Sequence, residues 1–291
     1  MAKLVTFSVD GVVRPGALRD GQVLDLAAAG CPVGPAGDLG AIVDGGEAAM
    51  DKVRRAIASW SAPQHALRAV SLHAPILRPS KVIGIGLNYI DHCKEAGLAV
   101  PDEPVMFTKH STSVNGPYDD VTWPADLCHD IDYEAELGVI VGRRAFRVAE
   151  KSAMSHVFGY SVVNDVSARD LQFLGPRQWD LGKSLDSFCP YGPCIVTADE
   201  IADPQALDLR LTVNGVEKQH SNTKNMIFGV AGLIAYLTRG ITLLPGDLIA
   251  TGTPFGVGLG MKPPVYLKDG DVCEVEIEKI GTIRNRMRVL R

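Results

Sequence analysis

The chain has 291 residues, of which 46% are hydrophobic, and its 29 basic and 34 acidic residues give a net charge of −5. This length allows one large domain, or a large domain with a small one, and the composition suffices for a buried core. A slightly acidic chain without basic runs does not fit a nucleic-acid-binding protein. The longest apolar stretch, residues 226–237, is too short to span a bilayer, so we expect no membrane partner.

The first residues and the cysteines bear on the cellular compartment of the protein. The N-terminal residues show neither a signal-peptide pattern nor an Arg-rich transit peptide, so we expect a cytoplasmic protein. The six cysteines are scattered and form no C-x-x-C motif, which disfavours a thiolate zinc site or a redox pair. In a reducing cytosol they are expected to be free thiols, mostly in the core.

Residues 1–75 are predicted to form a small N-terminal α+β domain. Two short strands flank the turn Asp10-Gly11, and a third follows. These strands are expected at residues 4–9, 12–14 and 22–26. A helix over residues 47–60 has apolar side chains at helical spacing, and Asp44 is its expected N-cap.

Residues 76–291 are predicted to form the catalytic domain. From residue 81 the pattern is β-rich, with Asn214-Gly215 as a hairpin turn and one amphipathic helix over residues 226–239. Strands are expected at residues 82–85, 137–141, 159–163, 194–197, 207–213, 248–251 and 272–278. Too few helices alternate with these strands for a doubly wound sheet, so we assign a β-rich α+β class.

Two carboxylates two residues apart are the most informative local feature. Glu134 and Glu136 lead directly into an apolar, β-branched run. On a strand, positions i and i+2 face the same side, so the two acids would lie next to each other and repel. A divalent cation that prefers oxygen ligands, such as Mg²⁺, Mn²⁺ or Ca²⁺, would offset this repulsion. The other interpretation is a solvated strand face, which is what we predict for Glu274, Glu276 and Glu278.

Asp165 is a candidate third ligand, because it follows the apolar run at residues 159–163. An acid at the end of a strand is well placed for a site. It could instead cap a following helix, and Asn164 and Asp170 compete for either role.

His92 and Glu95 are three residues apart, so they share one face of a helix. A carboxylate can orient an imidazole that takes a proton from water, although a solvated helix with an incidental histidine gives the same pattern. Gly97 and Pro101 interrupt the chain after this short helix, which is typical of a lid. His129, close to the metal strand, is the nearest rival histidine.

The chain resembles the fumarylacetoacetate hydrolase family, because five motifs occur in the order in which that family has them. They are GLNYIDHCKE at 86–95, DYEAELG at 132–138, NDVSARD at 164–170, GKSLD at 182–186 and TGTP at 251–254. The match covers roughly residues 79–291. Residues 178–190 are most similar to the branch of the family that contains fumarylacetoacetate hydrolase domain-containing protein 2 and its bacterial relatives. The resemblance implies a rolled, mixed β-sandwich.

The resemblance also implies the roles of individual residues. Family members hold Mg²⁺, sometimes Mn²⁺ or Ca²⁺, at the positions of Glu134, Glu136 and Asp165. A His–Glu dyad corresponds to His92 and Glu95, and a lysine near the metal corresponds to Lys183. The substrate's carboxylate and keto oxygens would meet the groups at Arg169, Gln172 and Thr253.

We therefore expect a Mg²⁺-dependent hydrolase that cleaves a C–C bond in 2,4-diketo acids such as acylpyruvates or fumarylpyruvate. His92, oriented by Glu95, would activate water, and Lys183 would stabilise the enolate of the departing pyruvate. The alternative is an oxaloacetate tautomerase or decarboxylase, or a dienedioate isomerase, with the same enolate-stabilising site. A third possibility is a non-catalytic, metal-stabilised scaffold, which would have no need of a base.

A homodimer is also expected. Apolar strands with few helices to cover them need a partner surface, and two-fold dimers are the commonest solution. The resemblance implies that the large domain supplies the interface, so the dimer would survive deletion of residues 1–75.

Overall fold

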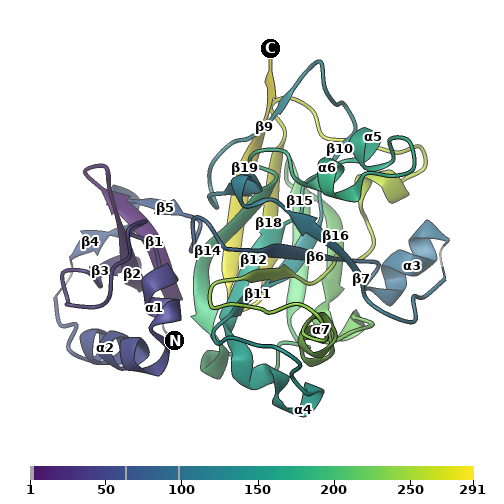
Figure 1. Cartoon of the computed structure of the whole chain (residues 1–291). Coiled ribbons are helices and arrows are strands. Elements are labelled where there is room, and N and C mark those ends of the chain that lie inside the picture. Colours follow the sequence, from purple (N-terminus) through teal and green to yellow (C-terminus); the bar gives the residue numbers. More distant parts are fainter. Residues whose placement is uncertain (1–2, 63, 98) are drawn as a thin grey trace.

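Two β-sheets packed face to face form the centre of the molecule (Figure 1). The structure, a computed structural model, describes residues 3–62, 64–97 and 99–291. The larger sheet runs in the order β4 (His65–Ala66), β3 (Gln22–Asp25), β2 (Val12–Arg19), β1 (Lys3–Val9), β14 (Cys189–Thr197), β12 (Val157–Asn164), β11 (Ala135–Val141), β17 (Leu248–Ala250), β6 (Val82–Gly86), β7 (Val105–Lys109). In addition, β5 (Ser71–His73) pairs with β1, and β8 (Val114–Asn115) pairs with β14.

The smaller sheet covers one face of the larger one. Its order is β16 (Val216–Asn222), β15 (Asp208–Val213), β18 (Val272–Ile277), β19 (Gly281–Leu290), β9 (Val121–Pro124). A separate two-stranded ladder joins β10 (Ile131–Asp132) to β13 (Ser167–Ala168). This strand-rich α+β architecture confirms the fold class expected from the sequence.

Short helices lie around the sheets. They are α1 (Gly40–Asp44), α2 (Gly46–Ala58), α3 (Ile90–Ala96), α4 (Glu150–Ala153), α5 (Arg169–Gln172), α6 (Trp179–Lys183) and α7 (Val230–Leu237). Single 3₁₀ turns are η1 (Leu67–Ala69), η2 (Ser111–Ser113), η3 (Met154–His156), η4 (Ala198–Glu200), η5 (Thr223–Asn225) and η6 (Gly258–Gly260). Within the described ranges, no helix has the length and apolar character needed to cross a membrane.

Strand β11 shows how the core directs the site. All seven of its residues are buried, but the two faces enter different clusters. Leu137 and Val139 pack into the core between the sheets, whereas Ile140 belongs to the cluster under α1 and α2. The second face carries the even-numbered residues, which include Glu136. The strand therefore directs the carboxylate of Glu136 away from the inter-sheet core.

The N-terminal segment shares its sheet and part of its core with the rest of the chain. Strand β1 pairs with β14, and Leu4 packs in one cluster with Ile140, Tyr191 and Leu248. In Figure 1 the segment forms a lobe at the side of the sheets. We propose the division at residue 75 as a boundary that limited proteolysis would test.

Most of the expected strands are confirmed, with differences mainly at their ends. The Asn214-Gly215 hairpin joins β15 to β16, and both turn residues have positive φ as this turn requires. Strands β7, β9, β16 and β19 were not among the predicted strands. In β19, buried residues alternate with exposed arginines, whereas β16 is mostly polar and has one buried residue, Gln219. All six cysteines are free and buried, as expected.

Two helix predictions were wrong in their ends. Asp44 is the last residue of α1, and α2 begins after Gly45 without a side-chain cap. The predicted helix over residues 226–239 is limited to Val230–Leu237. Its expected first turn is extended instead, because the amide of Asn88 binds both backbone groups of Phe228.

We expect the 291-residue chain to be a dimer in solution, because large apolar side chains such as Phe146, Leu174 and Leu181 remain exposed on the single chain. Light scattering at micromolar concentration should give twice the mass of the 31.1 kDa chain. Deletion of residues 1–75 would uncover Ile140 and Tyr191, so assembly is best measured on the full chain. A monomeric mass would contradict the prediction.

Candidate metal centre and active site

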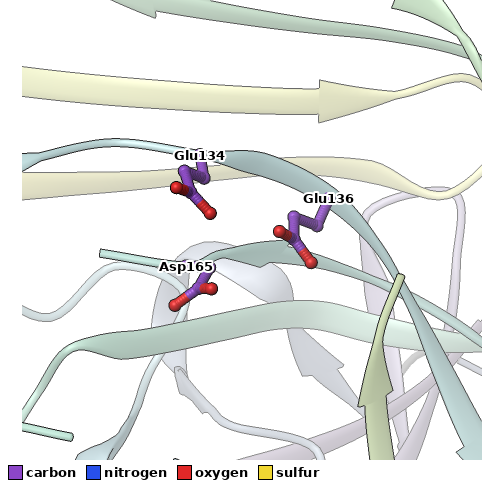
Figure 2. Close-up of side chains that lie close together, drawn as sticks. All are labelled: Glu134, Glu136 and Asp165. Carbon is purple, nitrogen blue, oxygen red and sulfur yellow. The ribbon is translucent and has the colours of Figure 1, made fainter. Parts of the chain in front are cut away.

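Three buried carboxylates lie together where β11 begins and β12 ends (Figure 2). They belong to Glu134, Glu136 and Asp165, and one oxygen of each lies within 4.8 Å of the others. The two glutamates face the same side because they are two residues apart. The backbone N–H of Asp165 donates to the carbonyl of Glu134 at 2.9 Å, which brings the third acid to them. All three are at most 6% exposed.

Two buried lysines contact this cluster. The Nζ of Lys183 donates to Glu134 Oε2 and to Asp165 Oδ2, both at 2.8 Å. The Nζ of Lys109 donates to the other oxygen of Asp165 at 2.5 Å and also to the backbone carbonyl of Lys183. Asp165 is therefore held between two ammonium groups, and the predicted alternative that it caps a helix is wrong.

Arg169 forms the third cationic contact. Its guanidinium donates to Glu134 at 2.7 Å, to Asp132 at 2.9 Å and to Gln172 Oε1 at 2.9 Å. Asp132 is fully buried and also accepts backbone N–H bonds from η6 (Gly258–Gly260) at 2.7 and 3.0 Å. Arg169 is thus fixed between a cluster carboxylate and the loop that carries η6.

The carboxylates differ in how well cations compensate them. Burial alone would raise the pKa of Glu134, but Lys183 and Arg169 outweigh it and lower that pKa to about 2. Burial raises the pKa of Glu136 well above its usual range, and the charges of Asp165 and Glu134 add to this. All the potential metal ligands are oxygen atoms, and the three carboxylates carry one more charge than the two lysines that contact them. The cluster therefore fits a divalent cation such as Mg²⁺ or Mn²⁺.

Metal binding should therefore release a proton. The raised pKa means that Glu136 keeps its proton at pH values above the usual range of a glutamate, and a cation must displace it. As the pH rises toward that raised pKa, the affinity for the metal should increase by about tenfold per pH unit. Above the pKa the affinity should level off. Calorimetry in two buffers of different ionisation enthalpy measures the proton count. Glu276→Gln, an exposed acid on β18, is the control, and binding without proton release would contradict the prediction.

A pocket of about 560 Å³ opens onto the cluster. Its lining includes every residue that the sequence proposed for the site except Glu136 and Asp165, which lie deeper. Those lining residues are His92, Glu95, Glu134, Arg169, Gln172, Lys183 and Thr253. The pocket thus unites residues from α3, α5, α6, the residue before β11 and the segment after β17, which are separated by up to about 160 positions along the chain.

His92 and Glu95 form a pair on α3, as their spacing predicts. The Nδ1 of His92 lies 3.4 Å from Glu95 Oε2, and both side chains are mostly buried. Glu95 also accepts the backbone N–H of Gly256 at 3.0 Å. A Cβ added to Gly260 would lie 2.5 Å from the carboxylate carbon of Glu95, so a larger residue there would displace this carboxylate from its position.

The segment after β17 completes the wall. The N–H of Gly252 donates to Glu136 Oε2 at 2.8 Å, and its φ of +98° favours glycine. The hydroxyl of Thr253 donates to the carbonyl of Ala135 and accepts from the amide of Gln219, which fixes it against β11.

Two further residues of the site were not foreseen. Lys109 is the last residue of β7, a strand that was not among the predicted ones. Asp132 belongs to a quoted motif but had no expected role. A lysine and an aspartate beside apolar strand residues were the available signals. Conversely, His129 is exposed, and the acids of β18 pair with surface arginines, so the solvated face predicted there is confirmed.

Replacing Lys109 with Met should destabilise the protein by about 3–5 kcal/mol, because it leaves Asp165 buried with one cationic partner fewer. Denaturant unfolding should show a lower midpoint with an unchanged slope. Lys151→Met, an exposed lysine on α4, is the matched control and should change stability by less than about 0.5 kcal/mol. Equal stability of the two variants would contradict the role of Lys109.

A strand-rich fold with a buried carboxylate centre, a lysine beside it and a His–Glu pair across one pocket is typical of metal-assisted enzymes. The profile of the fumarylacetoacetate (FAA) hydrolase C-terminal domain matches residues 81–288. The chain therefore belongs to the fumarylacetoacetate hydrolase family. Members of this family are enzymes, including hydrolases and isomerases, and they bind small keto acids.

Three similar proteins illustrate the range of activities. The chain is 52% identical over 214 residues to 2,4-didehydro-3-deoxy-L-rhamnonate hydrolase of Sphingomonas sp. (strain SKA58), covering 73% of this chain and 75% of the relative. It is 45% identical over 243 residues to human mitochondrial oxaloacetate tautomerase FAHD2A, covering 83% and 77%. The structure of maleylpyruvate hydrolase from Sphingobium sp. SYK-6 with manganese(II) and pyruvate superimposes with a TM-score of 0.83 at 29% identity, covering 100% of both chains.

Proposed function

We propose that this protein is a Mg²⁺-dependent hydrolase that cleaves the C3–C4 bond of 2,4-diketo acids, giving pyruvate and a second carboxylic acid. The observation that carries the proposal is one pocket lined by both a His–Glu pair and the lysine–carboxylate centre. Hydrolysis needs a base for water and a cation for the departing enolate, and the two face a common space. A non-catalytic scaffold would need neither.

The chain's residues would act as follows. His92, held by Glu95, takes a proton from water, whose oxygen attacks the C4 carbonyl carbon. The C3–C4 bond then breaks, and its electron pair forms the enolate of pyruvate. The ammonium of Lys183 faces this charge, and a proton delivered to C3 completes the product. Arg169, Gln172 and Thr253 would orient the substrate's carboxylate and keto oxygens.

The cation would be held by Glu134, Glu136 and Asp165. When bound, it would polarise the oxygens of the substrate's 2-oxo acid group and neutralise charge that develops there. We propose Mg²⁺ as the native ion, with Mn²⁺ or Ca²⁺ as alternatives. Mn²⁺ has support from the maleylpyruvate hydrolase complex. Reconstitution of the metal-free protein with each ion, followed by calorimetry and activity measurements, would identify the ion that is used.

A second candidate is keto–enol tautomerisation or decarboxylation of oxaloacetate, or isomerisation of a dienedioate. Identity of 45% to an oxaloacetate tautomerase favours it, and enolate stabilisation without attack by water needs the same lysine–carboxylate centre. Incubation with an acylpyruvate and with oxaloacetate, each with and without Mg²⁺, separates the candidates. Release of pyruvate only from the acylpyruvate supports the hydrolase, whereas rapid conversion of oxaloacetate alone supports the alternative.

The cytoplasmic location also remains our proposal, whereas several relatives are named as mitochondrial. Fractionation of the native host with an antibody to this chain would test it.

A further inference from the structure

Two cations lie at the mouth of the pocket. Arg177 and Lys262 both line the pocket and are exposed. The other cations of the lining, Arg169 and Lys183, are buried and form ion pairs with carboxylates. In the part of the chain that the structure describes, neither Arg177 nor Lys262 forms an ion pair. The site therefore has positive charge to offer at its outer end.

An apolar wall separates these cations from the bottom of the pocket. The Nζ of Lys183 lies 5.0 Å from the ring centroid of Phe107, which lies 5.8 Å from that of Trp179. Further out, the guanidinium carbon of Arg177 lies 5.7 Å from the ring centroid of Phe173. Exposure rises along this series from 2% for Lys183 and 5% for Phe107 to 41% for Phe173. The wall thus runs from the buried centre to the solvent.

The charges at the bottom match one carboxylate only. Three carboxylates, the two lysines that contact them and one divalent cation leave a single positive charge, and Arg169 is already neutralised by Asp132. A second carboxylate on the substrate would remain uncompensated there. At the mouth, a guanidinium can bind a carboxylate through two parallel hydrogen bonds, and an ammonium adds a further charge.

We propose that the pocket selects 2-oxo acids that carry a second carboxylate at the far end of an apolar chain, and that Arg177 and Lys262 bind this carboxylate. This inference rests on the proposed function, since it assumes that the 2-oxo acid group occupies the bottom. Oxaloacetate fits the arrangement poorly, because only two carbons separate its carboxylates and it has nothing to place against the apolar wall. A longer dicarboxylic substrate would use both ends and the wall.

Binding of two unreactive probes tests the proposal. 2-Oxohexanedioate and 2-oxohexanoate have the same number of carbons and differ in the terminal carboxylate. Calorimetry on the Mg²⁺- or Mn²⁺-loaded protein should show tighter binding of the dianion. Arg177→Met and Lys262→Met should each weaken dianion binding by about 3- to 10-fold and leave the monoanion within about twofold. Arg68→Met, an exposed cation outside the pocket lining, should change neither.

The outcomes are decisive in both directions. Equal weakening of both probes would mean general attraction of anions and would overturn the proposal. Unchanged dianion affinity in a variant that combines Arg177→Met with Lys262→Met would also overturn it. Neither probe has a C4 carbonyl, so neither can be cleaved, and the result does not depend on hydrolysis. If acylpyruvates are not hydrolysed but the dianion preference depends on Arg177 and Lys262, the recognition stands and the proposed hydrolase activity fails. Failure of both probes to bind would overturn the recognition itself.

Discussion

Asp165→Asn will weaken binding of Mg²⁺ or Mn²⁺ by more than about 100-fold and remove most of the activity. Loss of a residue that only supports a ligand already costs about 10- to 100-fold in affinity, and Asp165 is predicted to be a ligand itself. The substitution also leaves Lys109 and Lys183 facing the site with one carboxylate fewer, so their charges oppose the cation. Titration with Mn²⁺, followed by calorimetry, measures the affinity directly.

Asparagine is a better replacement than alanine here, because its carbonyl can still accept a hydrogen bond from a buried ammonium. Glu134→Gln and Glu136→Gln should behave similarly. The matched control is Glu276→Gln, which changes a carboxylate in a similar E-x-E pattern on the solvated β18. Circular dichroism should show native folding for all four. If the Asp165→Asn protein binds metal as tightly as the wild type, Asp165 is not a metal ligand.

The contrast between the two E-x-E patterns shows how much local sequence can predict about the burial of a carboxylate pair. Both place their acids on one face of a strand, as a period of two requires. On β18 the acids alternate with buried apolar residues, and the pattern correctly predicts a solvated face. On β11 every residue is buried, and continuous apolar sequence after Glu136 was the signal for this burial. The acids were recognisable because they precede a strand that is buried on both faces.

The cations that complete the centre were less predictable. Lys109 is 56 positions from Asp165 in the sequence, and nothing local in β7 indicates which strand lies beside it. The same applies to Asp132, whose partners in η6 are about 126 positions away. Residues such as Lys183, by contrast, were found through the motif that surrounds them. Pairings of this kind depend on sheet order, which periodicity does not determine.

The wrong helix ends have similar causes. The cap at Asp44 failed because Gly45 and Gly46 interrupt the chain and start a second helix after the first. The helix predicted from residue 226 lost its first turn to Asn88, a residue about 140 positions away. Intrinsic preference is a weak signal where a distant side chain can satisfy the same backbone groups.

His92→Ala will slow C–C hydrolysis of an acylpyruvate by about 10²- to 10⁴-fold, the usual range for loss of a general base. The imidazole lines the pocket beside Glu95, and Glu95 is itself held by the N–H of Gly256, so the pair is positioned in the pocket that also contains Glu134 and Lys183. Metal affinity should change little, because His92 is outside the carboxylate cluster. Steady-state release of pyruvate and Mn²⁺ titration measure the two quantities separately.

The controls for this variant separate a base from a structural role. His129→Ala removes an exposed histidine that lies outside the pocket lining and should retain full activity. Glu95→Gln keeps a hydrogen-bond acceptor for the Gly256 N–H but removes the charge, so hydrolysis should fall while folding is preserved. Hydrolysis that survives intact in His92→Ala would show that another group activates water. If only the enolate-dependent conversion of oxaloacetate remains in His92→Ala, the lysine–carboxylate centre supplies that chemistry without the dyad, because forming an enolate by decarboxylation requires no activated water.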